Sequence, residues 1–170
     1  MRDLQIRTET TEDRAAVYKL NVMAFGGPAE ANLVEALRDG GFVRLSLVAE
    51  VQGEIVGHLL FSRLPIITAG GVVEALSLAP LAVHPEWQRR GIGSRLMERG
   101  LLLCREAGHR IVLVLGHPEY YPRFGFSASL AAPLTSPFGG GDAWMALELV
   151  PGALSGVVGN VEYSPPFTEL

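Results

Sequence analysis

The chain has little of the chemistry that crosslinks proteins or binds metals. Its 170 residues include one cysteine, Cys104, so an intrachain disulfide and a thiolate metal cluster are both excluded. The four histidines lack metal-ligand spacing with one another or with acidic residues, and we expect no metal site. Cys104 falls in a helical pattern of apolar residues, which predicts a buried thiol without a chemical role.

Long apolar segments and a basic excess are also missing from the sequence. No run approaches the ~20 apolar residues that cross a bilayer. The first residues, 1–3, carry an acid at once and do not resemble a secretory signal, so we predict a cytoplasmic protein without a membrane partner. A net charge of −4 disfavours a nucleic-acid partner. The 48% hydrophobic content predicts a single folded domain over 1–170.

The periodicity of the apolar residues predicts a mixed α/β chain. The expected strands are 3–8, 43–51, 55–63, 72–83, 111–115, 126–131, 143–150 and 157–163. The expected helices are 10–24, 28–38 and 92–107. Pro80 interrupts the strand at 72–83, and because proline has no amide donor it predicts a bulge or a local loss of pairing.

The helix expected at 92–107 connects two strands and should pack closely on them. A crossover helix normally makes the two strands that it joins, here 72–83 and 111–115, parallel. Gly100 lies on the apolar face of this helix, and a residue without a Cβ lets the helix approach a sheet closely.

The turn that precedes this helix has the composition of an anion site. Amides at a helix N-terminus have no intrahelical partner and lie at the positive end of the helix dipole. Gly91 and Gly93 let an anion approach those amides, while Arg89 and Arg90 add positive charge. The stretch 88–94 therefore predicts a phosphate or diphosphate site.

Three phosphate-binding motifs compete for this stretch. A Walker loop ends in Gly-Lys-Ser/Thr, but the only lysine is Lys19. A dinucleotide fingerprint needs a small residue three positions after its second glycine, where Leu96 stands. The third pattern is Gln-x-x-Gly-x-Gly at 88–93, directly after Leu-Ala-Val-His-Pro at 81–85. It resembles the diphosphate motif of the GNAT superfamily of N-acetyltransferases.

A second stretch supports this resemblance independently. Tyr121, three residues, Gly125 and Phe126 resemble the short helix and exit that follow the fifth strand in that family. The order of elements agrees over about 4–150, and the ending from 143 resembles a bacterial branch of predicted acetyltransferases. The resemblance implies a mixed, mostly antiparallel central sheet of about seven strands, with strands 4 and 5 splayed apart and about four flanking helices.

The resemblance also implies a reaction. It is the transfer of an acetyl group from acetyl-CoA to a primary amine, on a small molecule or a protein, by direct attack in a ternary complex without a metal. A homodimer is compatible with it. The implied cofactor-binding residues are Leu81, Ala82, Val83, Gln88, Arg89, Arg90, Gly91, Ile92, Gly93 and Ser94. Tyr121 is implied as the catalytic group that protonates or hydrogen-bonds the CoA thiolate, and its neighbour Tyr120 as a packing aromatic.

One part of the family pattern is missing. The family often has a glutamate on the fourth strand as general base, where this chain has Ser77; Glu74, Glu30 and Glu119 are alternative bases. An α-amine acceptor, with a pKa of about 7.7–8.0, would need little help from a base. The missing glutamate leaves open a non-catalytic CoA-binding or regulatory domain, and a general nucleotide-phosphate binder is a third possibility. The acceptor pocket is expected from the first two helices and the late loops, including 25–31 and 136–142.

Overall fold

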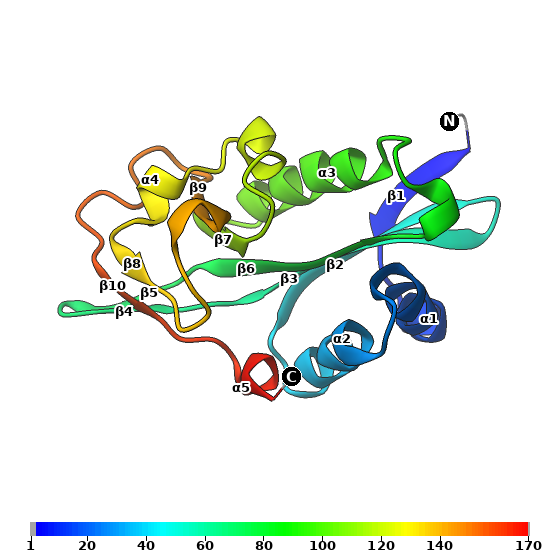
Figure 1. Ribbon diagram of the computed structural model, residues 1–170, viewed down its shortest axis with the longest axis horizontal. Coiled ribbons are helices and arrows are strands. Elements are labelled where there is room, and N and C mark those ends of the chain that lie inside the picture. The colour runs from blue at the N-terminus through cyan, green and yellow to red at the C-terminus, as the bar shows by residue number, and fades with distance from the viewer. Residues whose placement is uncertain (1–2, 170) are drawn as a thin grey trace.

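A six-stranded sheet forms the centre of the protein in the computed structural model, which describes residues 3–169 (Figure 1). Its strands lie in the order β1-β2-β3-β6-β7-β9. Their bounds are Leu4–Thr8, Val43–Val51, Glu54–Arg63, Leu76–Val83, Ile111–Leu115 and Trp144–Glu148. Only β6 and β7 are parallel neighbours, and every other adjacent pair is antiparallel. The sheet is therefore mixed and mostly antiparallel, as expected.

A second, smaller sheet extends the first at one end of the molecule. Its order is β5-β4-β10-β8, and the bounds are Gly71–Val73, Ile66–Thr68, Gly159–Val161 and Leu134–Thr135. β4 and β5 form a hairpin that projects from the main sheet in Figure 1. Together with the segment before α5, this sheet closes the core on the side away from the N-terminus.

Helices cover both faces of the central sheet (Figure 1). α1 (Arg14–Phe25) and α2 (Ala29–Asp39) lie on one face, and α3 (Ile92–Glu106) lies on the other. Two single-turn helices follow later in the chain, α4 (Ala128–Ala131) and α5 (Pro165–Thr168). Within residues 3–169 no helix is long and apolar enough to cross a membrane, and the longest, α3, has 15 residues.

Close packing of α3 on the sheet depends on two glycines. A Cβ built on Gly100 would lie 2.9 Å from side-chain atoms of Leu59 and Phe61. A Cβ built on Gly57 of β3 would lie 2.9 Å from the Leu96 side chain of α3. The predicted close approach at Gly100 is therefore confirmed.

The parallel pair β6 and β7 separates soon after it begins. The two strands pair only at Leu76 with Val112 and at Ser77 with Leu113. On its other side, β6 has a register shift against β3 near Leu60, opposite the position of Pro80. The expected irregularity at Pro80 and the expected splay of the fourth and fifth main strands are both confirmed.

Two expected strands differ from the structure. The strand expected at 126–131 is wrong, because Ser127 caps the one-turn helix α4 by accepting a hydrogen bond from the Leu130 amide at 3.3 Å. Only Ser127 still pairs with β9, opposite Ala146. The run 72–83 is divided into β5 and β6, because Ala75 turns its carbonyl to the Leu64 amide at 2.8 Å.

A buried polar network joins α1 and α2 to the sheet. The fully buried His58 lies 2.9 Å from the Ser46 Oγ through Nε2 and 3.3 Å from the Asn21 Nδ2 through Nδ1. Ser46 donates to Glu9 at 2.6 Å, and Glu9 is ion-paired with Arg38. Burial, with a smaller effect of the Arg38 charge, lowers the pKa of His58 to about 3. His58 is therefore neutral in the folded protein at physiological pH.

Candidate active site

The turn between β6 and α3 is held by local hydrogen bonds. The His84 Nδ1 atom accepts from the Glu86 amide at 3.1 Å, which fixes a 3-10 turn at Pro85–Trp87. The Gln88 side chain donates to the Val83 carbonyl at 3.2 Å. The backbone then takes the left-handed conformation twice, at Arg89 (φ 64°) and at Gly91 (φ 81°). This geometry turns the chain sharply into the first turn of α3.

The backbone amides of this turn are available to a ligand. The first intrahelical bond of α3 runs from the Arg95 amide to the Gly91 carbonyl at 3.1 Å. Among the described residues, no protein atom accepts a hydrogen bond from an amide of 88–94. No acidic side chain occupies the first turn, and no side chain caps it. The positive end of α3 is therefore open to an anion.

A cleft of about 910 Å³ lies in front of these amides. One wall comes from the end of β6 and the start of α3, and the other from the segment after β7. Its lining residues are Leu81, Val83, Trp87, Gln88, Arg89, Gly91, Ile92, Gly93, Ser94, His117, Glu119, Tyr120 and Arg123. The Tyr120 hydroxyl reaches across to within 3.2 Å of the Ser94 Oγ. The Arg123 guanidinium lies over the Tyr120 ring, 5.3 Å from its centre, and adds a cation to this wall.

Eight of the ten sequence-predicted cofactor residues line this one cleft. The two that do not are Ala82 and Arg90. Because side chains alternate along a strand, Ala82 faces away from Leu81 and Val83 and is buried. The Arg90 guanidinium stacks over the Trp87 ring at 4.9 Å. Ile92 is buried as well, so its amide and not its side chain is available to a ligand.

The sequence-predicted catalytic Tyr121 lies in the core beside the cleft. It belongs to the buried cluster that contains Leu78 of β6 and Val114 of β7. Its ring meets that of Tyr120 edge to face, with centroids 5.2 Å apart. The space for it comes from Gly116, where a Cβ would lie 2.5 Å from the Tyr121 ring. Burial, with a smaller contribution from Tyr120, raises the pKa of Tyr121 to about 12, so its hydroxyl stays protonated.

Sequence reasoning missed several residues of the second wall. Tyr120 was expected only to pack; it packs on the core and also lines the cleft. His117 lines this wall and Trp87 lines the opposite one, although nothing in their spacing indicated a common site; Glu119, expected only as an alternative base, lines the cleft as well. The segment after β7 was recognised by its sequence pattern. The local 3-10 turn at Tyr121–Phe124 decides which of the two tyrosines, Tyr120 or Tyr121, faces the cleft.

A second, smaller cavity lies where β6 and β7 diverge. Its volume is about 230 Å³, and it is lined by Leu33, Ser77, Leu78, Ala79, Leu115, Phe138, Tyr163 and Phe167. Ser77 is the last residue of β6 that pairs with β7, and Leu115 ends β7. Phe138 comes from the loop expected to contribute to an acceptor pocket, whereas 25–31 contributes no lining residue.

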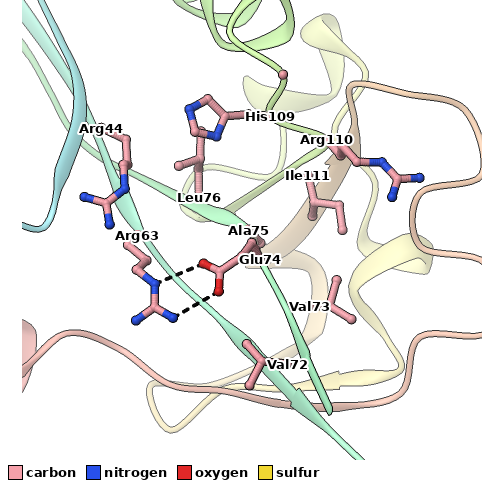
Figure 2. Close-up of a pocket in the computed structure, with 11 residues that line it drawn as sticks. Arg44, Arg63, Val72, Val73, Glu74, Ala75, Leu76, His109, Arg110 and Ile111 are labelled. Carbon is pink, nitrogen blue, oxygen red and sulfur yellow. Dashed lines mark hydrogen bonds and ion pairs between the residues drawn. The ribbon is translucent and has the colours of Figure 1, made fainter. Parts of the chain in front are cut away.

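The carboxylate of Glu74 lies in a different cavity, of about 510 Å³ (Figure 2). It receives two hydrogen bonds from Arg63, each of 3.0 Å, and these lower its pKa. Figure 2 shows the guanidinium groups of Arg44 and Arg110 on opposite sides of Glu74. Because its pKa is lowered, chiefly by the hydrogen bonds from Arg63, Glu74 is poorly suited to act as a base.

The residues around these cavities supply no metal centre. No group of three or more His, Cys, Asp or Glu side chains comes together to hold a metal ion in the part of the chain from 3 to 169. Cys104 is buried in α3, and burial raises the pKa of its thiol to about 12.

This geometry agrees with the comparison to known proteins. The sequence profile described as Acetyltransferase (GNAT) domain matches residues 5–129. The chain belongs to the GNAT acetyltransferase family. That membership confirms the expected class of enzyme, whose members acylate amines.

Relatives in Escherichia coli strain K12 cover much of the chain. The uncharacterized N-acetyltransferase YhbS is 35% identical over 164 residues, 95% of this chain and 97% of its own. The uncharacterized N-acetyltransferase YjhQ is 42% identical over 119 residues, 67% of this chain and 64% of its own.

Solved structures of two GNAT proteins share the fold. The crystal structure of Escherichia coli YhbS in complex with CoA has a TM-score of 0.90 at 33% identity, covering 98% of this chain and 92% of that one. A GNAT family acetyltransferase from Brucella melitensis in complex with acetyl-CoA has a TM-score of 0.81 at 32% identity, covering 96% and 97%. Both similar proteins were therefore crystallised with a CoA ligand.

Proposed function

We propose that the protein transfers an acetyl group from acetyl-CoA to a primary amine by direct attack in a ternary complex. The observation that carries this proposal is the row of free amides at 88–94, which borders a cleft leading along β6. An anion at a helix N-terminus is stabilised by both the amide donors and the helix dipole. The diphosphate of CoA fits this position, where Arg89 and Arg123 line the cleft wall.

The pantetheine arm would lie in the gap between β6 and β7. From Leu78 to Val83, the edge of β6 that faces β7 pairs with no other strand among residues 3–169. An extended chain with amide groups can pair with such an edge like an added strand. This pairing would bring the thioester carbonyl to backbone amides near 81–83, and one donor to a developing oxyanion is worth about 3 kcal/mol.

Tyr121 is the proposed partner of the leaving group. The amine nitrogen attacks the thioester carbon, a C–N bond forms, the C–S bond breaks, and the amine proton passes to solvent or a base. The sulfur leaves as a thiolate with an ordinary pKa of about 8.5. Since the pKa of Tyr121 is raised to about 12, its hydroxyl favours donating a hydrogen bond over complete proton transfer. Tyr121 shares one buried cluster with Leu78 of β6 and Val114 of β7, which supports a position near the gap.

Release of free CoA thiol from acetyl-CoA tests the proposal. Purified protein is assayed with acetyl-CoA and a panel of primary amines, and we expect thiol release only when a suitable amine is present. Thermal stabilisation by acetyl-CoA, with ATP as the comparison ligand, reports binding separately. Acetyl-CoA binding without thiol release for any amine would favour a non-catalytic CoA-binding domain. Equal stabilisation by ATP would contradict a site built for CoA.

A further inference from the structure

The small cavity at the divergence of β6 and β7 has an apolar lining. Its lining includes four aliphatic residues, Leu33, Leu78, Ala79 and Leu115, and no charged residue from the described part of the chain. Its hydroxyl groups belong to Ser77, which is buried, and to Tyr163. In the position where the family often has a carboxylate, this chain therefore presents a neutral hydroxyl in an apolar setting.

Aromatic rings form one wall of this cavity. The ring of Tyr163 lies 4.7 Å from that of Phe138 and 5.1 Å from that of Phe167, measured between centroids. The rings are inclined to each other by 61° and 59°, so they form an angled surface. They come from three separate segments of the C-terminal part: the loop after β8, the segment after β10, and helix α5. Such a surface packs well against one flat apolar group.

The cavity is lined by the β6 residues at which the gap between β6 and β7 begins. Ser77 is the last β6 residue paired with β7, and Leu78 and Ala79 follow it into the gap. Leu78 also belongs to the cluster that contains Tyr121. A molecule in this cavity would therefore lie beside the thioester, on the side of β6 where Leu33 of α2 lines the cavity.

We propose that this cavity binds the acceptor, and that the acceptor is a small amine carried on a single aromatic ring, such as an arylamine, which enters uncharged. The inference rests on the proposed function. With a volume of 230 Å³ the cavity is smaller than the roughly 300–1,000 Å³ of sites for drug-sized ligands, which limits the acceptor to about one ring.

Charge selects against the common cationic acceptors. Moving an ammonium group from water into an apolar site is costly unless a carboxylate or several hydrogen-bond acceptors compensate it. Lysine side chains and polyamines are protonated at neutral pH, and no carboxylate lines the cavity. An arylamine is neutral at that pH, so it needs neither desolvation of a charge nor a general base. This accounts for Ser77 in place of the expected glutamate.

The test compares aniline with benzylamine, spermidine and a lysine peptide as acceptors. We expect kcat/KM for aniline to exceed that for the cationic amines by about tenfold or more, the scale on which pockets discriminate. Leu115→Ala should raise the KM for aniline without changing the KM for acetyl-CoA. Leu102→Ala is the matched control, because Leu102 is 41% exposed and Leu115 is 42% exposed, but Leu102 lies on α3 outside the cavity.

A charge variant and a binding measurement distinguish failure of the arylamine inference from failure of the proposed function. Phe138→Glu places a carboxylate at the half-exposed rim and should lower turnover of aniline while raising that of spermidine. Ligand-observed NMR with aniline and CoA-loaded protein measures occupancy without turnover, and Leu115→Ala should weaken it. Preferred acetylation of spermidine or the peptide, unaffected by these variants, overturns the arylamine inference and leaves the acetyltransferase intact. Aniline binding without acetylation of any amine instead overturns the proposed function.

Discussion

The hydroxyl of Tyr120 lies 3.2 Å from the Oγ atom of Ser94, so the segment after β7 touches the first turn of α3 across the cofactor cleft. The next residue, Tyr121, turns its ring the other way into the core. Two adjacent phenols therefore face different environments, one at the open amides and one beside the gap between β6 and β7. Their substitutions should have separable effects.

Tyr121→Phe should lower kcat by about 10- to 100-fold, the value of a hydrogen bond to a charged group. The KM for acetyl-CoA should change little, because Tyr121 does not line the cleft proposed to hold the diphosphate. Tyr120→Phe, the matched control, should mainly raise that KM by loosening the contact with Ser94. Steady-state kinetics of both variants measures the division. Unchanged kcat in Tyr121→Phe would remove this phenol from the mechanism.

Gly91→Val should weaken acetyl-CoA binding by about tenfold or more, because a left-handed non-glycine residue costs about 1–3 kcal/mol. A Cβ at Gly91 meets no atom within 4 Å, so the effect would come from the backbone and not from a clash. Calorimetric titration with acetyl-CoA measures it. Gly53→Val is the control, since Gly53 has the same φ of 81° in the β2–β3 turn and also meets nothing within 4 Å. Equal weakening in both variants would contradict a specific role of the turn.

Glu74→Gln should leave kcat/KM and its pH profile unchanged. Two hydrogen bonds from Arg63 lower the pKa of Glu74, so the carboxylate is a weak base, and its cavity is separate from the cleft and the proposed acceptor cavity. Because the Glu74 side chain is 62% exposed, the variant should cost at most about 1 kcal/mol of stability. A large fall in kcat, with acetyl-CoA binding retained, would assign Glu74 to the chemistry after all.

Local patterns in the sequence were sufficient for the main sheet and for the turn before α3. The alternation of apolar residues at 43–51 and their 3.6-residue period at 92–107 are properties of single elements. The strand and the helix observed there have bounds close to the expected ones. Pro80 indicated the irregular strand because a missing amide donor has the same effect in any sheet. Gly91 was expected only to let an anion approach the amides, and the structure adds its left-handed conformation.

Contacts between distant segments could not be predicted in this way. The aromatic wall joins Phe138, Tyr163 and Phe167, whose positions depend on the small sheet and on α5. No periodicity relates these three residues in the sequence. The helix at Ala128–Ala131 was missed because the Ser127 cap, and not apolar alternation, decides that conformation. The orientation of Tyr120 relative to Tyr121 depends on a single 3-10 turn.

Acid should destabilise the fold through His58. Its pKa is lowered to about 3 from the ordinary 6.5, so below pH 6.5 the unfolded chain binds a proton that the folded protein does not. Stability should therefore be complete above pH 6.5 and fall as the pH decreases toward 3, by up to about 1.4 kcal/mol per pH unit. Asp13, whose pKa is lowered mainly by its hydrogen bond to Arg7, adds acid sensitivity only below its ordinary 3.8.

The loss of stability between pH 6.5 and about 4.5 is thus attributed to His58, and substitution of His58 can test this. His58→Gln removes the titrating ring but keeps a polar side chain for Ser46 and Asn21. Its unfolding free energy should be lower than that of the wild type at pH 7, and it should change less with pH across this window. His109→Gln, on the α3–β7 connection, removes one histidine elsewhere and should keep the wild-type slope. Urea unfolding at several pH values measures all three proteins. If the unfolding free energy of His58→Gln falls with decreasing pH as steeply as that of the wild type, the buried ring is not the source of acid sensitivity. Removing a group that titrates must also remove its contribution to the pH dependence of stability.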